Sequence, residues 1–328
     1  MSGVRFFVHT LGCKVNQYDG EALRTEFVPA PFVSSTIEPL DVHVINTCSV
    51  TAEADRKSRQ LIRRVIRRNP EAFVVVAGCY ATACPREAAA IPGVSCVLSN
   101  GSLAQQKAAL VSALAERGYD LALLTDRQGG LVRLGERTRA FVKIGDGCDQ
   151  YCSFCRIPFT RGRPRSRPPD EIVREVAGLV AHGYREIVLC AIKMGIYGRE
   201  LGTDLVQLLR RLLDETGIER IRLSSLEAND VPRALIELLA GEPRLCPHLH
   251  LPLQSGSDRI LALMQRPYAR SEYDAVVQFA REIVPDFVAT TDLMVGFPGE
   301  TEADFAASLS ALEELEFGKT HLFRYSAR

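Results

Sequence analysis

The sequence lacks the features that mark a membrane-spanning, secreted or strongly charged protein. It contains 40 basic and 40 acidic residues, a balance that predicts no overall attraction to an acidic partner. No run of about 18 apolar residues is present, which argues against a membrane-spanning helix, and the first residues lack the apolar segment of a secretory signal. Tryptophan is absent as well, which excludes nothing. We therefore expect a cytoplasmic protein without a membrane partner, in which any nucleic-acid binding depends on local basic patches.

Cysteine, in contrast, is plentiful. The chain has 328 residues, of which 46 % are apolar, and this suits two domains with full cores. It also has ten cysteines. Thiols stay reduced in the cytoplasm, so metal or iron–sulfur ligation explains so many cysteines better than disulfides do.

Strand-like and helix-like segments alternate in the first third of the chain, which predicts a parallel sheet covered by helices. Strand-like runs at residues 4–9, 42–45 and 73–77 are each followed closely by a cysteine, namely Cys13, Cys48 and Cys79. The carboxyl ends of parallel strands meet at one edge of a sheet, so we expect this first cysteine set to converge there and to bind metal. The alternative is that the three are ordinary buried cysteines, which pack as small hydrophobic residues.

Other elements of this region are expected from local signals. Helices are predicted to begin near Tyr18, to run from about residue 51 to residue 68, and to cover residues 103–117. An irregular connection is expected at residues 28–40 and a short strand at residues 121–124. We place the end of an N-terminal, Rossmann-like parallel α/β domain at residue 125 and a linker at residues 126–139.

The rest of the chain, residues 140–328, predicts a partial (βα)6 barrel. Strand-like runs are at residues 140–144, 186–191, 220–226, 248–253, 288–295 and 319–325. Helical segments are expected between them, at residues 169–182, 204–216, 232–240, 271–283 and 301–316. Six parallel strands are fewer than the eight of a complete barrel, and functional loops are expected at their carboxyl ends.

A second cysteine set lies in the loop after the first barrel strand. Cys148, Cys152 and Cys155 have the spacing CxxxCxxC. Three thiolates are one fewer than a closed tetrahedral metal site needs. Such a set suits an iron–sulfur cluster that leaves one iron open to another ligand.

Several motifs occur in order along almost the whole chain. They are Leu11-Gly12-Cys13, Asn46-Thr47-Cys48, Gly78-Cys79, the second cysteine set with Phe154, the arginine-rich residues 161–167, Leu223-Ser224-Ser225-Leu226-Glu227, His250-Leu251-Pro252-Leu253-Gln254-Ser255-Gly256 and Val295-Gly296-Phe297-Pro298-Gly299-Glu300-Thr301. Together they resemble the methylthiotransferase family of radical S-adenosylmethionine enzymes. Gly12-Cys13-Lys14-Val15-Asn16-Gln17, Arg56-Lys57-Ser58-Arg59-Gln60 and Phe317-Gly318-Lys319 are most similar to the branch that methylthiolates N6-threonylcarbamoyladenosine in tRNA, next to the anticodon.

The resemblance implies two [4Fe–4S] clusters and S-adenosylmethionine as cofactors. The second cysteine set would hold the cluster that binds S-adenosylmethionine, and the first set would hold a cluster that carries the sulfur. A radical made from S-adenosylmethionine would take a hydrogen from C2 of the modified adenine, and a methylthio group would replace it. No catalytic side chain is predicted beyond the cluster ligands. The resemblance further implies tRNA and an electron donor, such as a flavodoxin or ferredoxin, as partners of a monomer.

Five residues near strand ends are predicted to contact S-adenosylmethionine: Phe154, Gly195, Glu227, Gln254 and Gly296. The aromatic ring suits packing against an adenine, the two polar side chains suit hydrogen bonding, and the glycines permit close approach of the backbone. The alternatives are a plain core aromatic, satisfied structural polar groups and simple turns.

Two basic stretches are predicted to contact tRNA phosphates. The first comprises Arg56, Lys57, Arg63 and Arg67 in one helix, whose Leu61 and Val65 are expected to face the sheet. The second comprises Arg161, Arg163, Arg165 and Arg167, directly after the second cysteine set. The alternative for the helix is a solvated charged face.

The chain also departs from the family pattern. It ends soon after the last predicted strand, so we expect the small C-terminal RNA-binding β-barrel (TRAM) to be absent. Ala191-Ile192-Lys193-Met194-Gly195 stands where members commonly carry Gly-Ile-Asn-Leu-Gly. Four cysteines match no ligand position and are expected to be structural: Cys84, Cys96, Cys190 and Cys246. The competing functions are methylthiolation of a ribosomal-protein aspartate and non-catalytic RNA binding by a protein that contains a metal or an iron–sulfur cluster.

Overall fold

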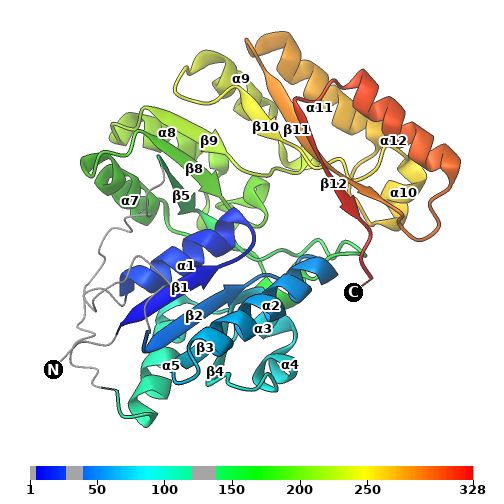
Figure 1. Ribbon diagram of the computed structural model, residues 1–328. Helices are drawn as coiled ribbons and strands as arrows, with labels where there is room; N and C mark the ends of the chain where they lie inside the picture. Colours follow the sequence, from blue (N-terminus) through cyan, green and yellow to red (C-terminus); the bar gives the residue numbers. More distant parts are fainter. Residues whose placement is uncertain (1–4, 27–39, 120–137, 328) are drawn as a thin grey trace. The chain divides into compact units, whose positions relative to one another are not determined.

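A computed structural model describes residues 5–26, 40–119 and 138–327 of the chain. They form two compact units, drawn in Figure 1. The first unit contains the described residues up to 119 together with Phe159–Arg161, and the second contains the described residues of Glu136–Pro158 and Gly162–Ala327. The strand expected at residues 121–124 and nearly all of the irregular connection at residues 28–40 lie outside the described residues. So does most of the linker, although its last residue begins a strand.

The first unit is built on a parallel sheet of four strands in the order β1-β2-β3-β4. The strands are β1 (Phe6–Thr10), β2 (Val42–Thr47), β3 (Phe73–Ala77) and β4 (Cys96–Leu98). The first three agree with the sequence prediction. The fourth was not predicted, because three residues carry no measurable alternation and two short helices, α3 (Gly78–Ala83) and α4 (Pro85–Ala89), precede it.

Helices cover both faces of this sheet, which gives three layers (Figure 1). On one face, Leu23 of α1 (Lys14–Glu26) and Leu110 and Leu114 of α5 (Leu103–Glu116) pack in one core cluster with residues of all four strands. On the other face, residues of α2 (Ala52–Arg68), α3 and α4 pack in a second cluster. The predicted Rossmann-like α/β fold of the N-terminal region is confirmed.

Local chemistry explains where the helices beside the cysteines begin. Thr51 accepts a hydrogen bond from the backbone N of Ala54 at 3.1 Å and caps α2 where the sequence predicted. The prediction for α1 was wrong, because this helix begins at Lys14 rather than near Tyr18. The backbone N of Gln17 donates to the carbonyl of Cys13 at 2.9 Å, so the first helical turn closes directly on the cysteine.

The second unit contains six parallel strands: β5 (Arg139–Lys143), β8 (Glu186–Cys190), β9 (Arg220–Leu223), β10 (His248–His250), β11 (Val288–Val295) and β12 (Lys319–Arg324). They form two three-stranded sheets, β5-β8-β9 and β10-β11-β12. A parallel bridge between Ser225 and His250 links the two sheets into one continuous order. The predicted partial (βα)6 barrel is therefore confirmed.

Helices alternate with these strands as expected: α7 (Pro169–Ala181), α8 (Leu205–Glu215), α9 (Arg233–Gly241), α11 (Arg270–Ile283) and α12 (Glu302–Glu314). Four short strands and α-helices were not predicted, namely β6 (Gly145–Asp146), β7 (Arg165–Ser166), α6 (Ile157–Arg161), whose last residues belong to the first unit, and α10 (Asp258–Leu263). Each has six residues or fewer, too few to show a hydrophobic period. In the described part of the chain, no helix is both long and apolar enough to cross a membrane.

Candidate functional site

The first cysteine set lies at the carboxyl edge of the first unit's sheet. The strand register aligns Thr10 of β1 with Asn46 of β2, and Asn46 with Ala77 of β3. The cysteines follow these aligned residues by three positions in β1 and by two positions in β2 and β3. Three residues that are far apart in sequence are thus brought to one edge of the sheet.

Two glycines let the cysteine-bearing loops come together. A Cβ atom on Gly12 would lie 2.8 Å from Sγ of Cys48, and Gly12 has a φ of +96°. A Cβ atom on Gly78 would lie 2.4 Å from the side-chain oxygen of Asn46, at a φ of +86°. Because an added side chain meets both a clash and an unfavourable φ, only glycine fits at either position without rearrangement.

Hydrogen bonds fix the same loops. The Asn16 amide donates to the carbonyls of Leu11 at 2.5 Å and Thr47 at 3.1 Å, and the Asn46 amide donates to the carbonyl of Asn16 at 2.7 Å. These bonds tie the loop that bears Cys13 to the loop that bears Cys48. The hydroxyl of Ser58 in α2 donates to the carbonyl of Cys48 at 3.0 Å.

The thiols of the first set are close enough to influence one another's pKa. Burial raises the pKa of Cys48 to about 11, and the nearby Cys13 and Cys79 raise it further. Among the described residues, no group of three or more His, Cys, Asp or Glu side chains converges tightly enough to hold one metal ion. Three cysteine thiols at one edge are the type of ligand that an iron–sulfur cluster uses.

Arg161 lies beside the first cysteine set. Its guanidinium donates to Sγ of Cys79 at 3.4 Å, to Asp19 at 2.5 Å and to the side-chain oxygen of Asn16 at 2.9 Å. Asn100 holds the same segment by donating to the carbonyl of Thr160 at 2.9 Å. Arg161 was predicted to contact RNA, but it is only 4 % exposed and has little surface to offer a phosphate.

The second cysteine set lies in a loop that is closed at its base. Residues 145 and 146 of β6 pair with residues 166 and 165 of β7 in an antiparallel hairpin. Beyond it, the backbone N of Cys148 donates to the carbonyl of Gly162 at 3.0 Å. A Cβ atom on Gly147 would lie 2.1 Å from the carbonyl oxygen of Arg163, so glycine is required where the loop leaves the hairpin.

Backbone amides and burial shape the thiols of this loop. Sγ of Cys148 accepts from the backbone N of Gln150 at 3.5 Å, and Sγ of Cys155 accepts from that of Ile157 at 3.4 Å. Burial raises the pKa of Cys155 to about 11, with Cys152 and Cys148 adding to the rise. Bound thiolates would therefore need the positive charge of a metal centre, as in the first set.

Arg266 lies beside the second cysteine set and was not predicted. It donates to Sγ of Cys152 at 3.4 Å and forms an ion pair with Glu227, and its side chain is only 3 % exposed. Neither this arginine nor Arg161 gives a sequence signal for such a contact, because each is more than 80 residues from the cysteine it meets. Glu227, which was predicted to bind S-adenosylmethionine, forms an ion pair with Arg266.

Lys193, at the departure from the family pattern, also lies near this loop. Its Nζ is 3.7 Å from Asp149, the neighbour of Cys148, and 3.8 Å from Asp230. A Cβ atom on Gly195 would lie 2.3 Å from Cβ of Asp230. The close approach that requires glycine at this position is therefore to the protein's own loop, which favours the structural alternative for Gly195.

The other predicted cofactor contacts differ in their surroundings. Phe154 packs against a buried cluster of Ile260, Met264 and Phe297, which favours the core alternative. Gln254 has a φ of +68° and bridges the strand ends through its backbone, which donates to the carbonyl of Asp292 at 2.8 Å. Gly296 has a φ of +74°, and a Cβ atom there would meet no atom of the described residues within 4 Å. Of the two predicted glycines, Gly296 therefore leaves room for another group, whereas Gly195 does not.

The predicted RNA contacts on α2 lie on its outer face. Arg63 and Arg67 are exposed, whereas Leu61 and Val65 are buried against the sheet as predicted. Arg56 and Lys57 are exposed too, but both contact Glu53, at 2.6 Å and 3.8 Å. The outward charge of this helix is therefore concentrated toward its carboxyl end.

The arginines after the second cysteine set fall into two groups. Arg163 and Arg165 are exposed. Arg167 is half-buried and donates to the carbonyl of Lys143 at 2.7 Å, and it is also 2.7 Å from Glu175. Arg163 and Arg165 thus have surface available for a phosphate, whereas Arg167 supports the strand that leads into the loop.

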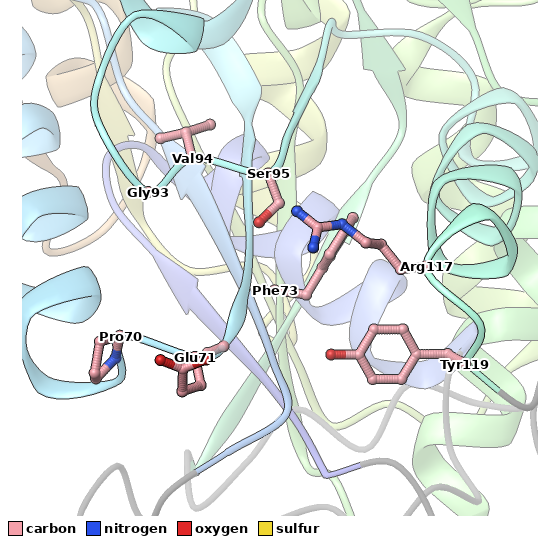
Figure 2. Close-up of a pocket in the computed structure, with 9 residues that line it drawn as sticks. Pro70, Glu71, Phe73, Gly93, Val94, Ser95, Arg117 and Tyr119 are labelled. Atoms are coloured by element: carbon pink, nitrogen blue, oxygen red, sulfur yellow. The ribbon is translucent and has the colours of Figure 1, made fainter.

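Figure 2 shows a pocket in the first unit that is separate from the first cysteine set. Phe73 and Ser95, which line it, lie at the amino-terminal ends of β3 and β4, whereas the cysteines follow the carboxyl ends. Arg117 and Tyr119 flank the ring of Phe73 there, at 5.8 Å and 6.0 Å. None of the predicted site residues lines this pocket.

Comparison with known families accounts for both halves of the chain. Residues 142–312 match the Radical SAM superfamily, and residues 5–99 match a family described as Uncharacterized protein family UPF0004. A radical S-adenosylmethionine methyltransferase, TsrM from Kitasatospora setae, has a similar fold, with a TM-score of 0.70 at 16 % identity over 98 % of this chain and 73 % of that one.

Curated relatives match over nearly the whole chain. The threonylcarbamoyladenosine tRNA methylthiotransferases MtaB of Thermotoga maritima and Bacillus subtilis are 38 % and 39 % identical, over 98 % of this chain and 74 % and 73 % of theirs. A tRNA-2-methylthio-N(6)-dimethylallyladenosine synthase of Thermotoga petrophila is 36 % identical over 99 % of this chain and 75 % of its own. The chain therefore belongs to the radical SAM superfamily and, within it, to the methylthiotransferase family.

Proposed function

We propose that this protein is a tRNA methylthiotransferase that inserts a methylthio group at C2 of N6-threonylcarbamoyladenosine beside the anticodon. The observation that carries the proposal is the pair of three-cysteine sets, each at carboxyl strand ends, in a chain that matches methylthiotransferases along almost its whole length. The choice of substrate rests on relatives of 37–39 % identity that are named for N6-threonylcarbamoyladenosine.

The cofactors are S-adenosylmethionine and [4Fe–4S] clusters, and both cysteine sets fit such clusters. When bound, these groups supply a carbon-centred radical at one set and the sulfur at the other. Three thiolates in each set would leave one iron of a [4Fe–4S] cluster without a protein ligand and so open to another ligand. The hairpin below the second set and the asparagine bonds around the first set hold the thiols in place.

Exposed cations offer a surface for the RNA. Arg63 and Arg67 of the first unit, and Arg163 and Arg165 of the second, are exposed, and we propose that they contact phosphates. The modified base must leave the stack of the anticodon loop to reach a cluster, and single-stranded loops permit this at low cost.

Anaerobic turnover with defined substrates tests the proposal. The full chain, S-adenosylmethionine and a reductant are incubated with tRNA carrying N6-threonylcarbamoyladenosine, with tRNA carrying N6-dimethylallyladenosine, and with ribosomal protein. Nucleoside and peptide mass spectrometry should find the methylthio product on the first substrate alone. A product on the second tRNA or on the protein would assign the chain to that substrate instead.

Metal analysis addresses the non-catalytic alternative. Two clusters correspond to about eight irons per chain, whereas a structural metal site would bring stoichiometric zinc and little iron. We further propose that the protein is a cytoplasmic monomer. A flavodoxin or ferredoxin is proposed as its electron donor, because reductive cleavage of S-adenosylmethionine needs an external electron. A two-domain organisation, with residues 126–139 as the linker, is proposed as well and is testable by limited proteolysis.

A further inference from the structure

Arg266 is held in one orientation by groups from several loops of the second unit. One nitrogen donates to Sγ of Cys152 at 3.4 Å, and another contacts the carboxylate of Glu227. The hydroxyl of Tyr268 accepts from the guanidinium at 3.0 Å and itself donates to the carbonyl of Pro252 at 2.6 Å. A side chain with this many fixed partners cannot turn away from the sulfur without leaving a buried charge uncompensated.

The charges of the pair are coupled inside the protein. An arginine guanidinium keeps its positive charge in proteins. Here one side of it faces the carboxylate of Glu227 and another faces Sγ of Cys152.

This geometry bears on electron uptake. A cluster gains one negative charge when it is reduced, and hydrogen bonds and positive charge at its sulfurs favour the reduced form. Arg266 would therefore raise the reduction potential of a cluster at the second cysteine set. Glu227 opposes this effect, because its negative charge lies on the other side of the guanidinium and offsets part of it.

We propose that Arg266 and Glu227 form a charge pair that sets the reduction potential of the cluster held by the second cysteine set, with Arg266 as the positioning residue for Cys152. The inference rests on the proposed function to the extent that it requires a cluster at this set. It also gives Glu227 a different part from the predicted one: it holds and balances the arginine instead of binding S-adenosylmethionine.

The direction in which each of two substitutions shifts the reduction potential separates this proposal from a purely structural role of the pair. Arg266→Gln removes positive charge and should lower the potential. Glu227→Gln removes negative charge while leaving the arginine in place, and should raise it. A structural part for the pair would give either no shift or shifts of the same sign.

The measurement is a redox titration of the anaerobically reconstituted full chain, followed by electron paramagnetic resonance. A background with Cys13, Cys48 and Cys79 each changed to Ala leaves only the signal of the second set. At a fixed potential, Arg266→Gln should lower the reduced-to-oxidised ratio at least tenfold, which equals about 59 mV for a one-electron couple. Glu227→Gln should raise that ratio, and Arg266→Lys should fall between Arg266→Gln and the unaltered chain.

Matched controls come from an exposed ion pair in the same unit. Arg185 and Glu219 are 2.6 Å apart and precede β8 and β9, at the strand ends opposite the cysteine loop. Arg185→Gln and Glu219→Gln change charge in the same way and should leave the ratio within twofold. A shift in these variants comparable to that of Arg266→Gln would overturn the proposal.

The remaining outcomes are also decisive. If Arg266→Gln loses its iron, the sign measured for Glu227→Gln decides alone, and an unchanged or lowered ratio there overturns the proposal. The redox titration contains no tRNA. A protein that fails to modify tRNA would therefore contradict the proposed function without changing the result of the titration. If the unaltered chain binds zinc and forms no cluster, both proposals fail, and the metal analysis identifies that case.

Discussion

The two cysteine sets each contain three cysteines, but different structural elements bring them together. The first is assembled by a sheet, since its members follow three adjacent strands and span residues 13–79. The second is assembled by one loop, since its members lie within residues 148–155 above a two-residue hairpin. Even so, each set has a buried arginine that donates to one cysteine sulfur at 3.4 Å and is paired with a carboxylate.

The recurrence of this contact on unrelated backbones is instructive. Asp19, the partner of Arg161, comes from a helix, whereas Glu227, the partner of Arg266, comes from a loop after a strand. Neither element dictates an arginine at a sulfur. What the two sites share is a set of three cysteines with a buried arginine that donates to one of the sulfurs.

Removal of a single ligand from each set should have the largest effects and should separate their functions. Cys152→Ala should abolish reductive cleavage of S-adenosylmethionine, because the cluster that binds it loses a ligand. Cys48→Ala should retain cleavage but lose the methylthio product. Both are measured by chromatography of 5′-deoxyadenosine and of digested tRNA. Cys246→Ala, at a buried cysteine outside both sets, should change neither, and equal cleavage by Cys152→Ala and the unaltered chain would refute the assignment.

A smaller effect is expected from Arg161→Gln. The substitution leaves Cys79 without its donor and Asp19 without its partner, so the first set should bind iron about 10–100-fold more weakly, as for other residues that support metal ligands. Iron loss to a chelator, followed by spectroscopy, measures this, with Arg174→Gln as an exposed control. Equal loss of iron from both sets would show that Arg161 does not act specifically on the first set.

The exposed arginines of α2 offer a contrast with the buried ones. Arg63→Gln combined with Arg67→Gln should weaken tRNA binding severalfold and lower the slope of log Kd against log salt by about 1.4–1.8, since each phosphate contact contributes about 0.7–0.9. Filter binding at several salt concentrations measures this. The double variant Arg185→Gln and Arg233→Gln changes the same charge in the second unit and should leave the slope unaltered.

The smallest expected effect is a pH dependence confined to the first unit. His9 of β1 and His43 of β2 lie 3.0 Å apart, and burial, His43 and Arg64 lower the pKa of His9 to about 4. Between pH 6.5 and 4 the unfolded chain therefore binds a proton that the folded chain does not, so stability falls as the pH falls. We expect a loss of about 1–2 kcal/mol from His9, a figure reduced for its partial exposure.

Denaturant unfolding of the metal-free chain, followed by hydrogen exchange in β1, measures this loss. His9→Gln should flatten the dependence, whereas His182→Gln, at an exposed position of the second unit, should not. A profile for His9→Gln as steep as that of the unaltered chain would assign the acid sensitivity to other groups.

The sequence was most informative about candidate functional residues that lie at the carboxyl ends of strands. Cys13, Cys48 and Cys79 could be grouped because parallel strands place their carboxyl ends at one edge, and the register of β1, β2 and β3 does so. The barrel strands could be predicted from two patterns: β5 and β8 contain apolar runs, whereas β9 and β10 alternate charged or polar residues with apolar ones. The short elements β4 and α10 could not, since no period is visible in so few residues.

The arginines show where sequence reasoning ends. Arg161 stands in an arginine-rich run, and composition alone assigned it to a solvated, RNA-binding surface together with Arg163 and Arg165. Its burial against Cys79 depends on a tertiary contact that spans 82 residues. Arg266 has no pattern around it at all, and its contact with Cys152 spans 114 residues. Contacts of this kind are decided by packing, which local patterns do not encode.

The hairpin of β6 and β7 also bears on the chain entropy of the loop that carries the second cysteine set. Pairing of Asp146 with Arg165 closes the segment that carries the second cysteine set. Closing a chain of about 20 residues costs about 2–3 kcal/mol of conformational entropy. Here the pairing of the two strands, rather than a contact between the cysteines, closes the segment. Closure by the hairpin raises the effective concentration of the three thiols relative to an open chain, and this would lower the entropy cost of binding a cluster.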